Sequence, residues 1–154
     1  MEKRNIGALA VTAAALFLAF YAAPAWGQDT GSIKMVRWNG IGGVSLSDAK
    51  NNSHYLNDAP DQTSDITSFT GLGDNRDEGY LVRIRGYLVP STTGSYTFYV
   101  EADDQGELWL STSSDPAGRV KICENTNFMQ TGTSSSISLT AGTRYYIEAF
   151  GKAN

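Results

Sequence analysis

The sequence contains almost no cysteine or histidine, and Cys123 and His54 are the single representatives among 154 residues. One thiol cannot form a disulfide within its own chain, so a disulfide framework is excluded. A lone cysteine can act as a nucleophile or as an intermolecular bridge. However, Cys123 ends the run RVKIC, and no histidine lies near it in the sequence. We therefore predict that Cys123 is a small buried apolar side chain.

Basic residues are outnumbered by acidic ones, and the formal net charge of the chain is −4. An acidic surface does not favour polyanions, which argues against nucleic acid as a partner. After residue 27 the sequence has no apolar run long enough to cross a bilayer. We therefore expect no stable membrane insertion of that part of the chain.

The one long apolar run stands at the start of the chain. Two basic residues precede it, it ends near Tyr21, and Ala25 and Gly27 follow at the −3 and −1 positions of a cleavage site. This order is typical of a secretory signal peptide, and the run is short for the alternative, a membrane anchor. We predict a signal peptide over residues 1–27, one domain over residues 28–154, and a secreted or cell-surface location.

Alternation of apolar and polar residues between glycine-containing turns dominates the rest of the chain. In residues 80–89, apolar side chains fall on one face while Arg83, Arg85 and Tyr87 fall on the other. Residues 95–101 alternate again after a short loop, which predicts a β-hairpin. Further strands are expected at 33–38, 107–111, 119–123, 137–139 and 143–150. Short strands with frequent turn signals predict an all-β antiparallel sandwich or barrel.

Two regions depart from this pattern. Residues 45–79 are rich in Asp, Asn, Ser, Thr and Gly, and they predict a long ordered loop with one helical turn near residues 47–51. The last strong strand signal ends at Phe150, close to the end of the sequence. An exposed edge strand is a liability. We expect this strand to pair with another chain or, preferably, the domain to lack a C-terminal strand.

Three segments resemble PA14 domains of the bacterial secreted type. They are VRWNGIGGVSLSD from Val36, YLVRIRGYLVPSTTGSYTFYVEADDQGELWLSTSSDPAG from Tyr80, and LTAGTRYYIEAFGKAN from Leu139. The resemblance extends from about Ser32 to Asn154, and the family's glycine-rich loop and last strand would follow. It implies an all-β fold of two packed antiparallel sheets. Because many PA14 domains are thought to bind carbohydrate, it also implies a non-catalytic carbohydrate-binding module with a role in adhesion.

The resemblance also implies a calcium site. In the yeast adhesin branch of the family, two consecutive aspartates joined by a cis peptide bind calcium, which bridges to sugar hydroxyls. Asp103 and Asp104 match that pair. Calcium takes about 6–8 oxygen ligands, so two carboxylates leave most positions to other loops and to water. The family's second loop would lie beyond Asn154, and we therefore expect weak calcium affinity.

Other residues could complete such a site. Trp109 falls out of phase with its two leucine neighbours and could stack on a sugar ring. Asn125 and Asn127 lie in a loop that could approach the aspartates. An alternative is that residues 103–106 are only a hairpin turn, since Asp and Gly suit tight turns. We expect no catalysis, because the paired carboxylates of glycosidases face each other about 5–10 Å apart across a substrate.

Two functions remain open at this point. The first is a carbohydrate-binding module assisted by calcium, with glycans as partners. The second is a structural, assembly or adhesion domain of a larger extracellular protein, which binds no sugar and contacts other domains of a longer chain. In that case we expect self-association through the strand that ends at Phe150. Loss of glycan binding on removal of calcium would distinguish the first from the second.

Overall fold

The computed structural model describes residues 10–14, 31–70, 79–128 and 130–154. Its strands are β1 (Ala10–Ala14), β2 (Ile33–Trp38), β3 (Gln62–Ile66), β4 (Tyr80–Leu88), β5 (Gly94–Glu101), β6 (Gln105–Ser111), β7 (Arg119–Asn125), β8 (Gly132–Thr133), β9 (Ile137–Leu139) and β10 (Tyr145–Ala153). Its helices are α1 (Leu46–Asn51), α2 (Ser53–Leu56) and the short 3₁₀ turn η1 (Pro116–Gly118).

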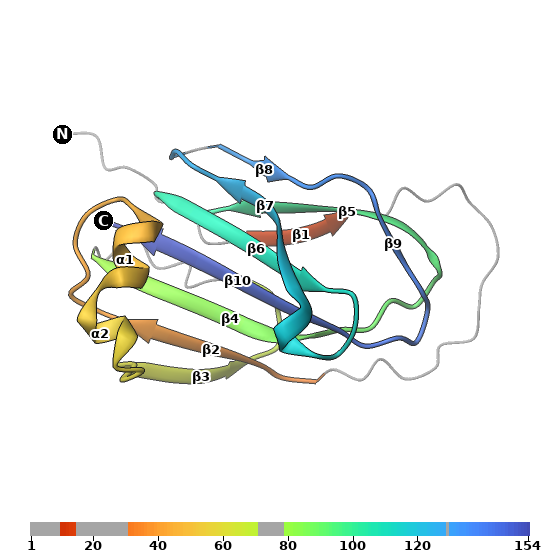
Figure 1. The fold of residues 1–154 in the computed structure, drawn as a ribbon, viewed down its shortest axis with the longest axis horizontal. Helices are drawn as coiled ribbons and strands as arrows, with labels where there is room; N and C mark the ends of the chain where they lie inside the picture. The colour runs from red at the N-terminus through yellow and green to blue at the C-terminus, as the bar shows by residue number, and fades with distance from the viewer. Residues whose placement is uncertain (1–9, 15–30, 71–78, 129) are drawn as a thin grey trace.

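The strands form two antiparallel sheets that pack face to face (Figure 1). One sheet has six strands in the order β3-β2-β4-β10-β6-β7. In the other, β5 pairs with β1, β8 and β9. The expected all-β sandwich is confirmed.

Alternation along the strands builds the core between the sheets. Successive side chains of a strand point to opposite faces, so one face of each strand is free to face the other sheet. The inward residues form one buried cluster, which includes Val82, Ile84, Phe98, Leu108 and Ile147. Each fully buried side chain of this kind contributes about 1.5–3 kcal/mol to the free energy of folding. The pattern predicted for residues 80–89 is therefore confirmed.

The two helices cover part of the outer face of the six-stranded sheet. There a second apolar cluster forms, in which Trp38 and Phe150 of the sheet pack with Leu46 and Ala49 of α1. The Ser45 hydroxyl caps α1 by accepting a hydrogen bond from the Asp48 N–H at 3.1 Å. The predicted helical turn is confirmed, whereas strand β3 was not expected. Residues 71–78 of the predicted loop lie outside the described residues.

The predicted hairpin of β4 and β5 is wrong. β4 pairs with β2 and β10, whereas β5 belongs to the other sheet. The loop after β4 carries the chain from one sheet to the other. It is held there by Gly142, whose N–H donates to the Pro90 carbonyl at 2.9 Å. Turn residues in a sequence do not reveal whether the chain returns in the same sheet or crosses to the facing one.

The last strand is central, so the expectation of an exposed edge strand is also wrong. β10 lies between β4 and β6, and all nine of its residues are buried (Figure 1). Its long apolar run, YYIEAF, is explained by this position, because a strand flanked on both sides is covered on both faces. Order along the chain does not determine order in a sheet.

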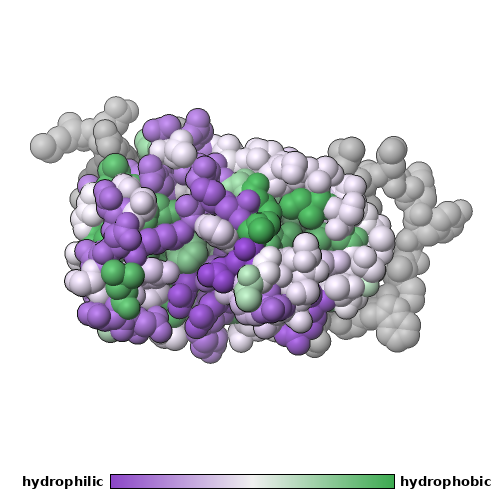
Figure 2. Space-filling view, viewed as in Figure 1, coloured by the Kyte–Doolittle hydropathy of each residue, from purple (hydrophilic) through white to green (hydrophobic). Residues whose placement is uncertain are grey.

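Cys123 is buried as predicted, with 8% of its surface exposed. Burial raises the pKa of its thiol to about 11. Near it, the two sheets leave an apolar groove of about 470 Å³ lined by Val120, Ile122 and Ile137 among others. Apolar atoms are visible between β7 and β9 on this face (Figure 2). Within the described residues, no helix has the length and apolarity needed to cross a membrane.

Strand β1 belongs to the segment for which the sequence predicts a signal peptide. Its backbone pairs with β5, with Ala10 opposite Glu101 and Ala14 opposite Thr97. The remaining residues of that segment lie outside the described part of the chain, and the signal peptide stays a prediction.

Candidate functional site

Asp103 and Asp104 lie at a corner where the chain passes from one sheet to the other. They connect β5 to β6, and these two strands pair with different partners in different sheets. The pair is therefore no hairpin turn, and that alternative is wrong. The peptide bond between the two residues is cis, the linkage that the family resemblance implied. Both residues are partly exposed at the end of the sandwich, although the Asp104 Oδ2 atom is buried.

Asn125 holds this corner in place. Its side chain is almost fully buried, with 2% exposed. The Nδ2 amide donates to the carbonyl oxygens of Ala102 at 2.9 Å, Asp104 at 3.2 Å and Asn127 at 3.3 Å. One side chain thus binds the backbone on both sides of Asp103 and also fixes the loop that follows β7. The sequence placed Asn125 near the aspartates, and the structure brings it there as a support beneath them.

A glycine makes this close approach possible. A Cβ atom on Gly106 would lie 2.7 Å from Asn125 Oδ1 and 2.9 Å from the Ala102 Cβ atom. Such distances are too short for real contacts, so any other residue at position 106 would displace the amide. Asn125 Oδ1 is buried, and within the described residues it has no hydrogen-bond partner.

Gln105 links the corner to two further loops. Its Nε2 donates to the Thr126 carbonyl at 3.1 Å, and its Oε1 accepts from the Leu46 N–H at 2.8 Å. Asn127 is exposed in the same loop as Thr126, and its side chain donates to the Thr126 hydroxyl at 3.3 Å. The start of α1, the acidic corner and the loop after β7 therefore meet at one end of the sandwich.

Trp109 does not belong to this assembly. It lies five residues after Asp104, a distance of about 16 Å along an extended strand. Its indole Nε1 donates to Glu107 Oε2 at 2.9 Å, and the Lys50 ammonium lies 5.4 Å from the ring centroid. The indole is half-buried against the cluster under the helices. The alternation that pointed Trp109 away from its leucine neighbours is correct, but α1 covers the face to which it points.

A buried cation stands beside the acidic corner. Lys152 of β10 is only 1% exposed, and its ammonium donates to the Ala153 carbonyl. Burial lowers the pKa of Lys152, and the charge of Asp104 opposes this effect. The two residues are also joined through the backbone, because the Asp104 N–H donates to the Lys152 carbonyl. Sequence reasoning missed Lys152. The signal was a lysine within a strand whose other residues, apart from Glu148, are aromatic, apolar or small.

The oxygens at the corner suit calcium in kind but are few in number. Carboxylates are ligands that calcium prefers, and about four to six further oxygens are needed. Within the described residues, no group of three or more His, Cys, Asp or Glu side chains could hold a metal ion. The Lys152 ammonium also neutralises part of the negative charge. Asp103 and Asp104 offer two of the hard oxygen donors that calcium prefers, and the remaining ligands would have to be amide oxygens, water or hydroxyls of a bound molecule.

Comparison with known proteins gives one family and several relatives. The PA14 domain family matches residues 39–150. Fibrocystin of Canis lupus familiaris is 33% identical over 86 residues, which are 46% of this chain and 2% of that protein. Fibrocystin of Mus musculus is 26% identical over 98 residues, again 2% of its length. The chain thus spans about one fiftieth of these curated relatives.

Solved structures share the fold. One is the Epithelial Adhesin 6 A domain from Candida glabrata in complex with Galβ1-3GlcNAc, with a TM-score of 0.61 and 13% identity. The alignment covers 80% of this chain and 74% of that one. The Epithelial Adhesin 9 A domain from the same organism, in complex with Galβ1-4GlcNAc, has a TM-score of 0.57 and 12% identity over 80% and 76% of the chains. At such identities the likeness establishes the fold alone.

Proposed function

Because the chain belongs to the PA14 domain family, we propose that it is a non-catalytic carbohydrate-binding domain that acts in adhesion, assisted by calcium at Asp103 and Asp104. The acidic corner carries this proposal. Two neighbouring carboxylates stand at the end of the sandwich on a backbone that Asn125 fixes from below. The shared fold with adhesin domains solved with disaccharides supports carbohydrate as the ligand class.

The chemistry of the corner suits a neutral sugar. Calcium prefers hard oxygen ligands and tolerates a variable coordination number, so sugar hydroxyls can fill positions that the protein leaves open. Asn127 is exposed at the rim and offers an amide to the same ligand. Trp109 is left out of the proposed contact surface, because it is packed under α1 away from the corner. No catalytic role is included, since the paired carboxylates of glycosidases face each other about 5–10 Å apart across a substrate, whereas Asp103 and Asp104 are adjacent in the chain.

A secreted or cell-surface location is part of the proposal. It is supported by the basic and apolar leader over residues 1–27 and by its small-residue exit. Protein recovered from the culture medium is expected to begin at Gln28, which N-terminal sequencing tests. A start at Met1 would contradict it.

One expectation of the assembly alternative is wrong, whereas contact with other domains of a longer chain stays a prediction. Self-association was expected through an open strand edge ending at Phe150. β10 instead pairs with β4 and β6 on its two sides, so its backbone groups are already used.

Glycan binding with and without calcium tests the proposal. Neutral oligosaccharides are screened for binding to the purified protein, first in millimolar calcium and again in excess EDTA. Those that bind are then titrated by calorimetry. Binding is expected only with calcium, and Asp104→Asn should abolish it. The matched control is Asp115→Asn, which removes the same charge from the other end of β6 and keeps an N-cap residue for η1. Equal binding in EDTA would refute the calcium role, and no binding to any neutral glycan would refute the function.

A further inference from the structure

Half of the outer face of the six-stranded sheet carries no helix. The other half lies under α1 and α2. It holds the second apolar cluster, formed around Trp38 and Val36 of β2 and the neighbouring positions of β4 and β10. The next rows along the sheet run through Lys34, Arg85 and Glu148, and then through Tyr87 and Tyr146. These residues share one face, because directly paired residues of neighbouring strands point to the same side.

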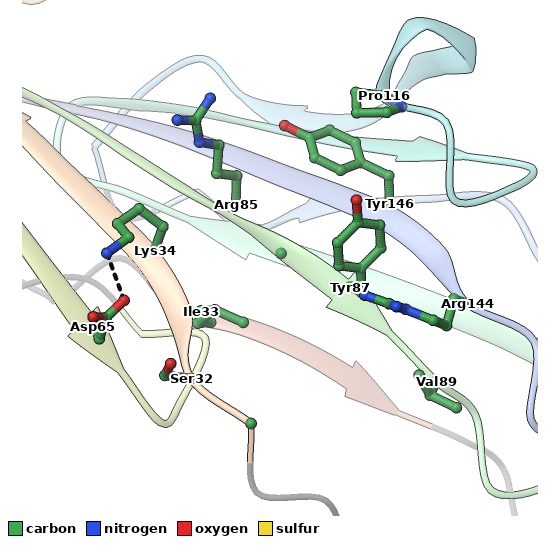
Figure 3. Close-up of a pocket in the computed structure, with 12 residues that line it drawn as sticks. Ser32, Ile33, Lys34, Asp65, Arg85, Tyr87, Val89, Pro116, Arg144 and Tyr146 are labelled. Atoms are coloured by element: carbon green, nitrogen blue, oxygen red, sulfur yellow. Dashed lines mark ion pairs between the residues drawn. The ribbon is translucent and has the colours of Figure 1, made fainter.

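This bare half forms a groove of about 890 Å³ lined by both tyrosines and by Lys34, Arg85 and Arg144 (Figure 3). Its volume falls in the range of ligand clefts, about 300–1,000 Å³. Ile33 and Gly86 also line the groove. Their strand positions point to the other face of the sheet, where a Cβ atom on Gly86 would lie 2.4 Å from Ile33 Cγ2.

Two tyrosines form an aromatic wall. Tyr87 is 42% exposed, and its ring meets that of Tyr146 edge-on at 5.9 Å between centroids. The Arg144 guanidinium lies 4.1 Å from the Tyr87 ring centroid. Burial and the charge of Glu148 raise the pKa of Tyr146, and the Tyr146 hydroxyl forms a hydrogen bond with the Glu148 side chain. That hydroxyl points toward Arg85 (Figure 3).

The groove has an excess of positive charge on a chain whose net charge is negative. The two carboxylates beside the groove already form ion pairs. Asp65 Oδ1 lies 2.7 Å from Lys34 Nζ, and Glu148 Oε2 lies 2.7 Å from Arg119 Nε. Among the residues that the structure describes, no carboxylate forms an ion pair with Arg85 or Arg144. Two guanidinium groups thus face the groove with capacity to bind an anion.

We propose that this groove is a second saccharide site, selective for acidic sugars with a ring carboxylate and independent of calcium. The Arg85 guanidinium would bind the carboxylate in bidentate fashion, with Arg144 as a second cation at the groove. The exposed face of Tyr87 would carry the sugar ring. A neutral sugar offers no anion to the guanidinium groups, and a polyphosphate chain offers no ring to lie on the exposed face of Tyr87.

Calorimetric titration of the purified protein with trigalacturonate in EDTA tests this site. EDTA separates it from the acidic corner, as does the variant Asp104→Asn, which should bind trigalacturonate unchanged. Arg85→Gln and Arg144→Gln are each expected to weaken binding about tenfold or more, since each removes a charge-assisted contact. Lys121→Gln is the matched control, because it removes one charge from β7 outside the groove. Thermal melting of each variant shows that it remains folded.

The expected pattern is calcium-independent binding that falls as salt rises from 0.1 to 1 M and is at least tenfold weaker for neutral galactotriose. Three results would each overturn the proposal: no binding of trigalacturonate, equal affinity for both trisaccharides, or an Arg85→Gln variant that binds as well as the Lys121→Gln control. Failure here leaves the calcium-dependent site at Asp103 and Asp104 standing. Failure of that site in turn does not affect this one.

Discussion

Replacing Asn125 by alanine should loosen the acidic corner at a cost that the hydrogen bonds allow to be worked out. The Nδ2 amide has two hydrogens and three acceptors, so its contacts amount to about two full hydrogen bonds, one of them shared. A buried hydrogen bond contributes about 1 kcal/mol, and leaving its acceptor without a donor costs more. We therefore expect Asn125→Ala to lower the free energy of unfolding by about 2–3 kcal/mol.

The assay is unfolding in urea, followed by tryptophan fluorescence and analysed by linear extrapolation. For a domain of this size the expected loss corresponds to a fall in Tm of about 10 °C. Asn127→Ala is the matched control. It removes the same side chain two positions later, where the amide is exposed and bonds only to Thr126 among described residues, so its effect should stay within about 0.5 kcal/mol.

A second substitution sharpens the test. Asn125→Asp keeps the shape of the side chain but turns a carboxylate oxygen toward three carbonyl oxygens, so it should destabilise the protein more than alanine does. The reasoning is refuted if Asn125→Ala costs less than about 1 kcal/mol, or if it costs no more than Asn127→Ala.

Three further predictions concern charges and the thiol. Asp104→Asn should lower stability in EDTA, because it leaves the buried Lys152 charge without its counter-charge, and it should do so less in a Lys152→Met background; a purely additive pair would show that their charges do not interact. Cys123 should resist labelling by Ellman's reagent until denaturant is added, and stability should fall as pH rises from 9.0 to about 11, because only the unfolded thiol ionises there; rapid labelling of the native protein would contradict its burial. Burial raises the pKa of Glu107, but the hydrogen bond and charge of Lys50 outweigh it, so the folded pKa lies below 4.5. The resulting stability is present above pH 4.5 and lost as pH falls through the folded pKa, and Glu107→Gln should reduce the acid loss measured by urea titration.

Local pattern was sufficient for the features that depend on neighbouring residues. The alternation of residues 80–89 predicted which side chains of β4 face the core, and it placed Arg83, Arg85 and Tyr87 on the other face. The place of Cys123 at the end of the strand segment RVKIC, with no histidine near it in the sequence, predicted a buried thiol. These predictions hold because strand geometry fixes the direction of each side chain relative to its neighbours.

The same reasoning could not predict which distant segments pair with one another. A turn signal after residue 89 predicted a hairpin where the chain crosses between sheets. A strand near the chain's end was expected at an edge but lies at the centre of six. Trp109 was expected to be open to ligand, yet α1 covers its face. In each case the outcome depends on which segments pack together, and a local pattern does not contain that information.

The sequence by itself determined an all-β domain, the strand faces, and two neighbouring carboxylates with the chemistry to attract a hard cation. Only the tertiary structure decided that Asn125 lies beneath those carboxylates, that Lys152 is buried beside them, and that a bare half-sheet collects arginines and tyrosines in one groove. The physical reason is that strand geometry is local, whereas a site is assembled by pairing and packing between segments that are far apart in the chain.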